Sequence, residues 1–517
     1  MLRQCENLCL IIFIFSIFST LSAQDSLYLV GSITGVSTEK KITNISRVGD
    51  VNGDGYDDFT VSSRTGKTRS DQGIVQLYLG SSNLDLTPDV TFHYPCCDTL
   101  NDFGAASEIG DVNGDGYDDF MLTGGFGDFG FSKGKVFLYY GGETIDTVPA
   151  AEFYEPWIQD GFGGVVVKLD DLNKDGYDDF SISSTYNWDN GKGYVYLFWG
   201  GDTITWNKSI TFTSNIVNDF FGESVTNIGD VNSDGFKDIA IGAPAGLLMD
   251  DTSKVYFYYG GFIIDTTKDY ILNGGSIYNI GDINLDNKVE FIFYNGKINI
   301  YSGLDSLISF SGYLNSSSYG DLNKDGYDDF IIGKTNYRNS DSMMVGGAYV
   351  YFGKPNIDTT FNLLLEGENK WDEFSKIITS EDINSDGFDE LFVLSPNFPD
   401  YTSPKGKVYI YSRINFTDIK DLHEKSKLNF HLYQNFPNPF NPTTNIQFSV
   451  SSREYVQLKV YDILGKEIAI LVNEEKPAGL HQIKFDTTNY HLGSGIYFCE
   501  LKMKGGIRKY IKLVFIK

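Results

Sequence analysis

Residues 111–119 read Asp111-Val112-Asn113-Gly114-Asp115-Gly116-Tyr117-Asp118-Asp119 and place side-chain oxygens at positions one, three, five and nine. Carboxylates this close repel one another unless a cation lies among them, and Ca²⁺ prefers about six to eight oxygen ligands. Gly116 permits the positive φ of a sharp turn that brings these side chains together. We therefore expect a calcium-binding loop in which the backbone carbonyl of Tyr117 is a further ligand.

Acidic stretches of this pattern occur seven times, and successive stretches start 61, 60, 59, 52, 39 and 61 residues apart. A period of this length indicates a repeat architecture. We predict Ca²⁺ ligands at positions one, three, five, seven and nine, with position seven contributing its carbonyl. The predicted metal ligands are Asp50, Asn52, Asp54, Tyr56, Asp58; Asp111, Asn113, Asp115, Tyr117, Asp119; Asp171, Asn173, Asp175, Tyr177, Asp179; Asp230, Asn232, Asp234, Phe236, Asp238; Asp282, Asn284, Asp286, Glu290; Asp321, Asn323, Asp325, Tyr327, Asp329; and Asp382, Asn384, Asp386, Phe388, Glu390.

Two other interpretations of these loops fit the residues less well. Asp, Asn and Gly favour solvated turns without any metal, but the recurrence of four side-chain oxygens at fixed positions favours a metal site. An EF-hand also requires a Glu at position twelve and flanking helices, whereas the first loop has Val61 there, inside an expected strand. The fifth loop should be the weakest site, because Asn287 replaces the turn glycine and Lys288 adds a positive charge.

The segments around each acidic loop have the character of β-strands. In the second repeat, Ala105–Ile109 precedes the loop, and Phe120–Leu122, Val136–Tyr140 and Ala151–Tyr154 follow it. Val, Ile, Phe and Tyr at near period-two spacing are typical of strands. Four strands in each of seven repeats predict an all-β fold, a seven-bladed β-propeller over residues 24–413. A linear β-solenoid is the alternative.

A ring of blades leaves two open edges unless it closes. Ser26–Gly31 stands where later repeats have their fourth strand, so we expect it to complete the seventh blade. The alternative closing strand is Ile414–Ile419.

The two ends of the chain have a different character. Residues 1–23 combine an apolar run with a small-residue end and are interpreted as a signal peptide. No later apolar stretch is long enough to span a membrane, so we expect no transmembrane segment in the mature chain. Residues 414–430 are polar and charged, as in a linker. Residues 431–517 alternate again and predict a small Ig-like β-sandwich.

Cysteine usage does not indicate a disulfide framework. Cys96, Cys97 and Cys499 remain after removal of the signal peptide, and an odd number with two adjacent members is unlike a set of bridges. Free or buried thiols and a bridge between Cys96 and Cys97 both stay open.

Short motifs near the acidic loops carry a family resemblance. Phe103-Gly104, Phe162-Gly163 and Phe221-Gly222 precede their loops, and Gly242-Ala243-Pro244 follows the fourth. This pattern resembles the FG-GAP repeat of the integrin α-subunit propeller. The resemblance implies Ca²⁺ bound on one face and a protein ligand on the opposite face. The seventh repeat departs from it with Phe374-Ser375, and repeats five and six lack Phe-Gly.

The C-terminal region carries a second resemblance. The run Asn435-Phe-Pro-Asn-Pro-Phe-Asn-Pro442, the segment Val460-Tyr-Asp-Ile-Leu-Gly465 and the strand Ser494-Gly-Ile-Tyr497 occur in this order. Together they resemble the C-terminal sorting domain of the type IX secretion system. The resemblance implies that the type IX secretion machinery is a partner and that the protein is secreted or anchored to the outer cell surface. An Ig-like adhesive module is the alternative.

Composition restricts the function. A net charge of −28 argues against nucleic-acid binding. The five histidines lie mostly in the linker and the C-terminal region, and neither G-x-S-x-G nor H-E-x-x-H occurs, so we do not expect an enzyme. Loops opposite the acidic face carry aromatic and charged residues that suit a glycan or protein surface, although they could equally pack as loop cores. The ligand-binding candidates are Phe129, Trp188, Tyr337, Arg338 and Tyr401.

The sequence thus predicts a calcium-binding propeller that recognises an extracellular glycan or protein. A polysaccharide-degrading enzyme built on a calcium propeller is one alternative, and a structural surface-layer component is another.

Overall fold

The structure is a computed structural model, and the chain divides into two compact units, residues 1–413 and 414–517. It describes residues 27–37, 41–64, 73–82, 86–95, 103–124, 134–154, 161–185, 191–204, 210–244, 253–312, 314–380, 382–399, 402–413, 431–432, 435, 438, 440–450, 454–463, 466–476, 479–490, 492–503 and 508–517. The expected signal peptide and linker lie outside these residues, as do Cys96 and Cys97.

The described part of the first unit forms seven four-stranded antiparallel sheets, here called sheets 1 to 7. Sheets 1 to 3 are β2 (Lys41–Gly49), β3 (Asp58–Arg64), β4 (Ile74–Tyr78), β5 (Val90–His93); β6 (Ala105–Gly110), β7 (Asp119–Gly124), β8 (Lys135–Tyr139), β9 (Ala151–Tyr154); and β10 (Phe162–Asp170), β11 (Asp179–Ser184), β12 (Tyr194–Phe198), β13 (Ile210–Phe212). Sheets 4 and 5 are β14 (Ser224–Asn227), β15 (Ile239–Ala243), β16 (Lys254–Tyr258), β17 (Tyr270–Asn273); and β18 (Ile277–Gly281), β19 (Glu290–Tyr294), β20 (Ile298–Ser302), β21 (Asp305–Phe310). Sheets 6 and 7 are β22 (Ser316–Gly320), β23 (Asp329–Lys334), β24 (Gly347–Tyr351), β25 (Leu363–Glu366); and β26 (Lys376–Ser380), β27 (Glu390–Ser395), β28 (Lys407–Ser412), β1 (Tyr28–Thr34).

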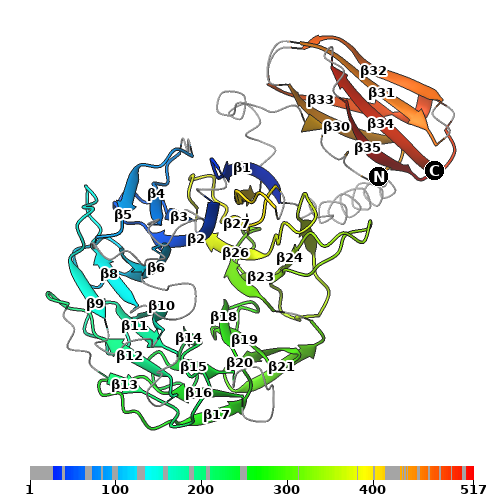
Figure 1. Cartoon of the computed structure of the whole chain (residues 1–517). Coiled ribbons are helices and arrows are strands. Elements are labelled where there is room, and N and C mark those ends of the chain that lie inside the picture. Colours follow the sequence, from blue (N-terminus) through cyan, green and yellow to red (C-terminus); the bar gives the residue numbers. More distant parts are fainter. Residues whose placement is uncertain are drawn as a thin grey trace, which may run out of the picture. The chain divides into compact units, whose positions relative to one another are not determined.

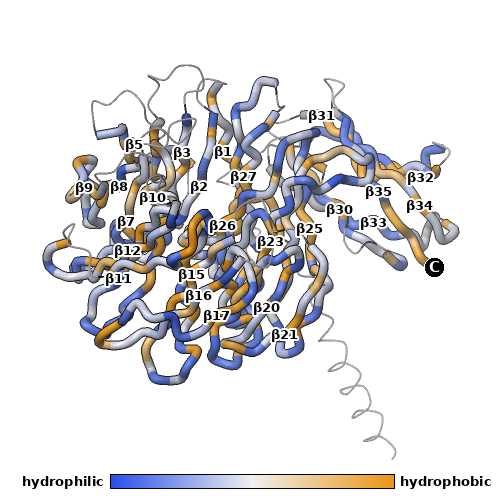
Figure 2. The backbone as a smooth tube through the Cα atoms, turned by 60° about the horizontal axis from the view of Figure 1, so that its bottom comes forward, coloured by the Kyte–Doolittle hydropathy of each residue, from blue (hydrophilic) through white to orange (hydrophobic). Residues whose placement is uncertain are grey.

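The core lies between neighbouring sheets. One hydrophobic cluster joins Val136 and Leu138 of sheet 2 to Phe180 and Ile182 of sheet 3. The middle strands are therefore covered on both faces, and the residues of β7 and β11 are buried throughout. Figure 2 shows hydrophobic backbone in strands such as β15 and β16, whereas many connecting loops are hydrophilic. Apolar burial of this kind is the main stabilising contribution.

The first strand of each sheet faces the centre of the unit and contacts its counterparts in the two adjacent sheets (Figure 1). These contacts run from β2 through β6, β10, β14, β18, β22 and β26 and back to β2. At the junction of the two ends, β1 pairs antiparallel with β28, from Tyr28 opposite Ser412 to Thr34 opposite Lys407. The strand expected at Ser26–Gly31 is therefore present a few residues later, and Ile414–Ile419 lies outside the described residues. The arrangement is consistent with a β-propeller.

The second unit contains two antiparallel sheets. One holds β29 (His431–Leu432), β30 (Thr443–Val450) and β33 (Gly479–Asp486); the other holds β32 (Glu467–Lys476), β31 (Glu454–Asp462), β34 (Gly495–Met503) and β35 (Arg508–Phe515). A short 3-10 helix, η2, spans Thr487–Asn489. Phe448 of the first sheet and Leu501 of the second share one buried cluster with Cys499, so the core lies between the sheets.

Strand β32 is not evident from the spacing of apolar residues in the sequence. Its pairing with β31 is interrupted at Leu458/Lys459 and Val460/Tyr461, which breaks the alternation of its buried residues. Its C-terminal half is also polar, Asn473-Glu474-Glu475-Lys476, and reads as loop. Among the described residues of both units, no helix is long and apolar enough to cross a membrane.

Candidate metal centres

The seven acidic stretches, here called loops 1 to 7 in chain order, each connect the first and second strands of one sheet. Because consecutive strands are antiparallel, all seven lie at the same end of their sheets. The loops between the third and fourth strands share that end. The loops between the second and third strands, and the connections between sheets, lie at the opposite end.

The first aspartate of each loop is held by the backbone that follows it. In loop 2, Asp111 Oδ1 accepts the N–H groups of Gly114 and Asp115 at 2.7 and 3.1 Å, and Oδ2 accepts that of Gly116 at 2.8 Å. Bonds to positions five and six recur in all seven loops, including loop 5, where Asn287 donates in place of glycine at 2.9 Å. The degraded fifth loop thus keeps the same turn, and Asn287 adopts the positive φ of 64° that the turn requires.

Positions three and five are fixed in the same way. Asn113 Oδ1 accepts the N–H of Asp115 at 2.9 Å, and Asp115 Oδ1 accepts that of Tyr117 at 3.1 Å. Equivalent bonds occur in the other six loops. A carboxylate has about four lone-pair sites. These bonds therefore orient the oxygens and leave acceptor capacity for a cation.

The carboxyl at position nine is fully buried in every loop. In loop 2, Asp119 Oδ2 accepts the N–H of Val112 at 3.0 Å, and Oδ1 accepts that of Gly141, just beyond the third strand, at 2.9 Å. Burial raises the pKa of these carboxyls: to about 8 for Asp58, Asp119 and Asp329, about 7 for Asp179 and Glu290, about 6 for Asp238 and about 9 for Glu390. A neighbouring cation would favour the ionised form.

Two loops use glutamate at position nine, and the strand opposite changes with it. Glu290 and Glu390 reach the Nδ2 groups of Asn284 and Asn384 at 3.1 and 2.8 Å. Position ten of these two loops pairs with Tyr301 or Tyr411 on the third strand. The next residue on that strand is a serine, Ser302 or Ser412. The five aspartate loops have a large residue there instead: Leu79, Tyr140, Trp199, Tyr259 and Phe352.

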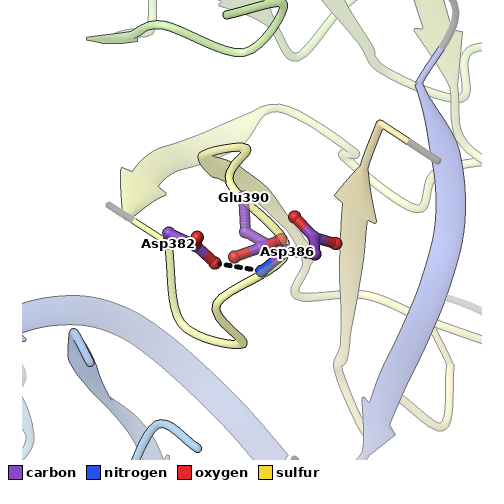
Figure 3. A group of neighbouring side chains, drawn as sticks. All are labelled: Asp382, Asp386 and Glu390. Atoms are coloured by element: carbon purple, nitrogen blue, oxygen red, sulfur yellow. Dashed lines mark hydrogen bonds between the residues drawn. The ribbon is translucent and has the colours of Figure 1, made fainter. Parts of the chain in front are cut away.

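Loop 7 gathers its carboxylates most closely. Asp382, Asp386 and Glu390 each offer an oxygen, and these oxygens lie within 4.8 Å of one another. Figure 3 shows the three side chains in one loop, with the N–H of Asp386 bonded to the carboxylate of Asp382. Among the described residues, this is the one group of three or more His, Cys, Asp or Glu side chains whose potential ligand atoms lie this close to one another.

The sequence-predicted ligands therefore lie on one turn in each loop, with positions one, three and five oriented by the same bonds. The carboxylate at position five accepts the N–H of the position-seven residue. The carbonyl of that same residue is the fifth predicted ligand. Oxygen-only, carboxylate-rich sites suit hard cations such as Ca²⁺, so the residues present fit calcium. Coordination by these residues stays a prediction.

Two of the five ligand-binding candidates belong to the described residues: Tyr337 contacts β24 and β25 of its own sheet, and Arg338 is bonded within its own loop. Tyr337 donates its hydroxyl to Glu366 Oε1 at 2.7 Å, and its ring lies edge-on to Tyr349. Burial, followed by the bond to Glu366, raises the pKa of Tyr337 to about 12. Arg338 Nη1 donates to the carbonyl of Ser342 at 2.9 Å. Phe129, Trp188 and Tyr401 lie outside the described residues.

Sequence analysis overlooked Trp371, on the connection between sheets 6 and 7. Its backbone has a φ of +70°, although 41% of its surface is exposed. Its N–H donates to the carbonyl of Met344 at 2.5 Å, and Lys370 Nζ lies 5.5 Å from its ring centre. A bulky residue with positive φ is a rare, strained conformation. The one signal in the sequence is a tryptophan in a polar connection, Glu366–Ser375.

Comparisons with known proteins agree with both resemblances. Residues 45–78 and 221–258 match the FG-GAP repeat, and residues 434–517 match the secretion system C-terminal sorting domain. The chain therefore contains integrin α-like FG-GAP repeats and a type IX sorting domain. The match to the sorting domain indicates a secreted or surface protein.

The similarity to integrins covers a limited part of each chain. A segment of 122 residues is 39% identical to integrin alpha-6 of Homo sapiens and covers 22% of this chain and 10% of that protein. Integrin alpha-7 of Rattus norvegicus is 30% identical over 151 residues, 28% of this chain and 13% of that protein. Integrin alpha-4 of Xenopus laevis is 28% identical over 152 residues, 27% of this chain and 14% of that protein. The chain thus matches about a tenth of the length of these relatives.

Proposed function

We propose that this protein is a calcium-stabilised, seven-bladed β-propeller that binds a glycan or protein outside the cell and is exported through its C-terminal Ig-like sandwich. The observation that carries the proposal is the sevenfold repetition of one hydrogen-bonded acidic turn at one end of seven consecutive sheets. The cycle of contacts among the first strands supports sheets 1 to 7 as blades of a closed ring. The pairing of β1 with β28 supports closure by the N-terminal strand.

Calcium in the acidic loops would be held by oxygens of positions one, three, five and nine, and by the carbonyl of position seven. Bound Ca²⁺ would supply positive charge that compensates the repulsion among these carboxylates. The chain's own residues do the rest: backbone N–H groups orient the carboxylates before binding, so little ordering is left to be done when the cation arrives. A cation that binds the folded form alone stabilises it by mass action.

The ligand is proposed to lie across the face opposite the acidic loops. The connections that carry Tyr337 and Trp371 are joined there by backbone bonds from Trp371 to Met344, Phe374 to Val345 and Gly367 to Gly346. They form one supported surface that presents an exposed indole beside Lys370. Tryptophan contributes a large contact area at low cost in side-chain entropy, which suits a binding anchor. Phe129, Trp188 and Tyr401 stay predicted ligand contacts.

Binding of the mature chain to glycan and protein arrays, with calcium and with chelator, tests this proposal. Trp371→Ala and Tyr337→Ala should each weaken binding at least about tenfold, measured at a temperature where both variants are folded, because Tyr337→Ala also removes the bond to Glu366. The matched control is Phe262→Ala, an aromatic residue 76% exposed at the acidic-loop end. Loss of binding in the control with retention in the two variants would reverse the assignment of faces. Turnover of a polysaccharide by the purified protein would contradict the non-catalytic role.

A further inference from the structure

Position eight of the acidic loops reaches into the preceding loop. Asp118, in loop 2, accepts the N–H of Asp50 on its Oδ2 at 2.9 Å, and its own N–H donates to the carbonyl of Asp50 at 3.1 Å. Asp50 is the first predicted ligand of loop 1. One residue of loop 2 thus holds both backbone polar groups of a calcium ligand in loop 1.

The contact recurs in three other pairs of loops. Asp178 of loop 3 accepts the N–H of Asp111 at 3.2 Å, and Asp328 of loop 6 accepts that of Asp282 at 2.7 Å. Asp389 of loop 7 accepts the N–H of Asp321 at 2.9 Å. The carbonyls of Asp111 and Asp282 also accept the N–H groups of Asp178 and Asp328, at 3.1 and 3.3 Å.

The glycine before each of these first ligands makes room for the contact. A Cβ at Gly49 would lie 2.2 Å from Asp118 Oδ2, and one at Gly281 would lie 2.2 Å from Asp328 Oδ2. Gly110 and Gly320 stand in the same relation to Asp178 and Asp389. No side chain fits between the two groups, so the carboxylate is held against the backbone of the neighbouring loop.

A second contact joins the same loops. The Tyr117 ring covers Gly53, position four of loop 1, where a Cβ would lie 2.6 Å from it, and Tyr177 covers Gly114 in the same way. Phe388 of loop 7 lies below Lys324 of loop 6, with Nζ 5.9 Å from the ring centre. Loops on adjacent sheets are therefore fixed against each other by two adjacent residues, positions seven and eight.

Among the described residues, the junction of loops 3 and 4 and that of loops 4 and 5 lack the carboxylate contact and supply internal controls. At the junction of loops 3 and 4, position eight is Lys237, and it forms an ion pair of 2.5 Å with Asp170, which replaces the glycine. At the junction of loops 4 and 5, position eight is Val289, whose side chain packs against Gly229. Neither residue offers an oxygen to the first ligand of the preceding loop.

We propose that Asp118, Asp178, Asp328 and Asp389 are positioning residues for calcium bound in the preceding loop. The inference rests on the proposed calcium binding. Each carboxylate fixes the backbone, and hence the Cα–Cβ direction, of the first metal ligand. It also places a second negative charge behind that ligand. Partners of metal ligands commonly change metal affinity about 10–100-fold when they are removed.

The test is a calcium titration of the full mature chain by calorimetry, together with melting curves in calcium and in chelator. Asp118→Ala should weaken calcium binding at one site by about tenfold or more. Asp118→Asn keeps an oxygen acceptor for the N–H of Asp50 and should recover part of the affinity. Val289→Ala, the matched change at a junction without the contact, should leave every site unchanged.

Combining Asp118→Ala with a variant that disables loop 1 or loop 2 shows which loop's calcium affinity depends on Asp118. In Asp54→Ala, which disables loop 1, adding Asp118→Ala should cause no further loss of calcium. In Asp115→Ala, which disables loop 2, the same addition should cause its full loss. The opposite pattern would show that Asp118 serves its own loop and would overturn the inference.

Two further outcomes are decisive. If Asp118→Ala lowers the melting temperature equally in calcium and in chelator while every affinity is unchanged, the contact is purely structural and the inference fails. If the unaltered protein binds no calcium, the proposed function itself fails, and this result is visible before any variant is examined.

Discussion

Glu290 and Ser302 are direct partners across β19 and β20, and the serine hydroxyl donates to Asp286 Oδ2 of the same acidic loop at 3.3 Å. The longer acid at position nine thus coincides with the smallest residue at the facing position, in sheet 5 and again in sheet 7. In the aspartate loops, a large residue occupies the corresponding position. The two positions form one packing unit that sets where the buried carboxyl lies.

Ser302→Leu should therefore overfill sheet 5 and destabilise the first unit by roughly 1–3 kcal/mol. Adding Glu290→Asp, which recreates the Asp and Leu combination of sheet 1, should recover part of the loss. A thermal double-mutant cycle measures this coupling. Strictly additive effects would show that the two positions are independent.

Removal of β1 should expose the edge of β28. Deleting residues 28–34 leaves the backbone groups of β28 without their partner strand, and an open edge favours association between chains. We expect a lower melting temperature and aggregation in size-exclusion chromatography. A truncated protein that remained monomeric and equally stable would mean that the ring is closed by another segment.

The ion pairs of Glu108 should give the first unit an acid-sensitive component. Glu108 lies 3.1 Å from Arg47 and 3.0 Å from Lys168. Burial alone would raise its pKa, but the two cations more than offset this effect and hold the pKa below its usual value. The folded pKa is depressed, so the stabilisation is present above the unfolded pKa of about 4.5 and is lost as the pH falls through the folded pKa.

Glu108→Gln should thus cost about 1–3 kcal/mol near pH 7, because Arg47 and Lys168 each lose one carboxylate partner and keep Asp57 and Asp178, respectively. The cost should become progressively smaller below about pH 4.5. Denaturant unfolding of both proteins across this range measures the difference. A difference independent of pH would assign the effect to packing instead of charge.

The sorting domain should act independently of the propeller fold. Removing residues 431–517 deletes the two sheets of the second unit together with the core between them. Sheets 1 to 7 keep all their strands. We expect a folded protein that accumulates in the periplasm, detected by fractionation of the native host. Unimpaired secretion of the shortened chain would show that this region is a binding module and not an export signal.

Local patterns in the sequence predicted the fold well, because the residues that determine the strands and the turn of each repeat are close together in the sequence. The acidic turns and the four-stranded repeats could be read from the spacing of Asp, Gly and aromatic residues. The features that the sequence did not predict depend on contacts between repeats. The sequence predicts no role for position eight, because the partner of Asp118 is the backbone of Asp50, 68 positions away. The signal in the sequence is the recurrence of one pair, a glycine before position one and an aspartate at position eight of the next loop, at Gly49 and Asp118 and again at Gly110 and Asp178.

Trp371 shows a second limit. Its strained backbone depends on the neighbouring connection through Met344, which sequence spacing does not reveal. The irregular pairing of β31 and β32 hid a strand for a comparable reason: a bulge shifts the buried face by one residue, and alternation fails across it.

The central claim, that the seven acidic turns hold calcium, is tested most directly by melting the mature protein in excess calcium and in excess chelator. Each turn collects carboxylates that repel without a cation, and a ligand present at about 100 times its Kd stabilises the folded form by about 2.7 kcal/mol per independent site. We predict a large fall in the melting temperature on chelation, reversed by adding calcium back. Superimposable melting curves in calcium and in chelator would contradict the account.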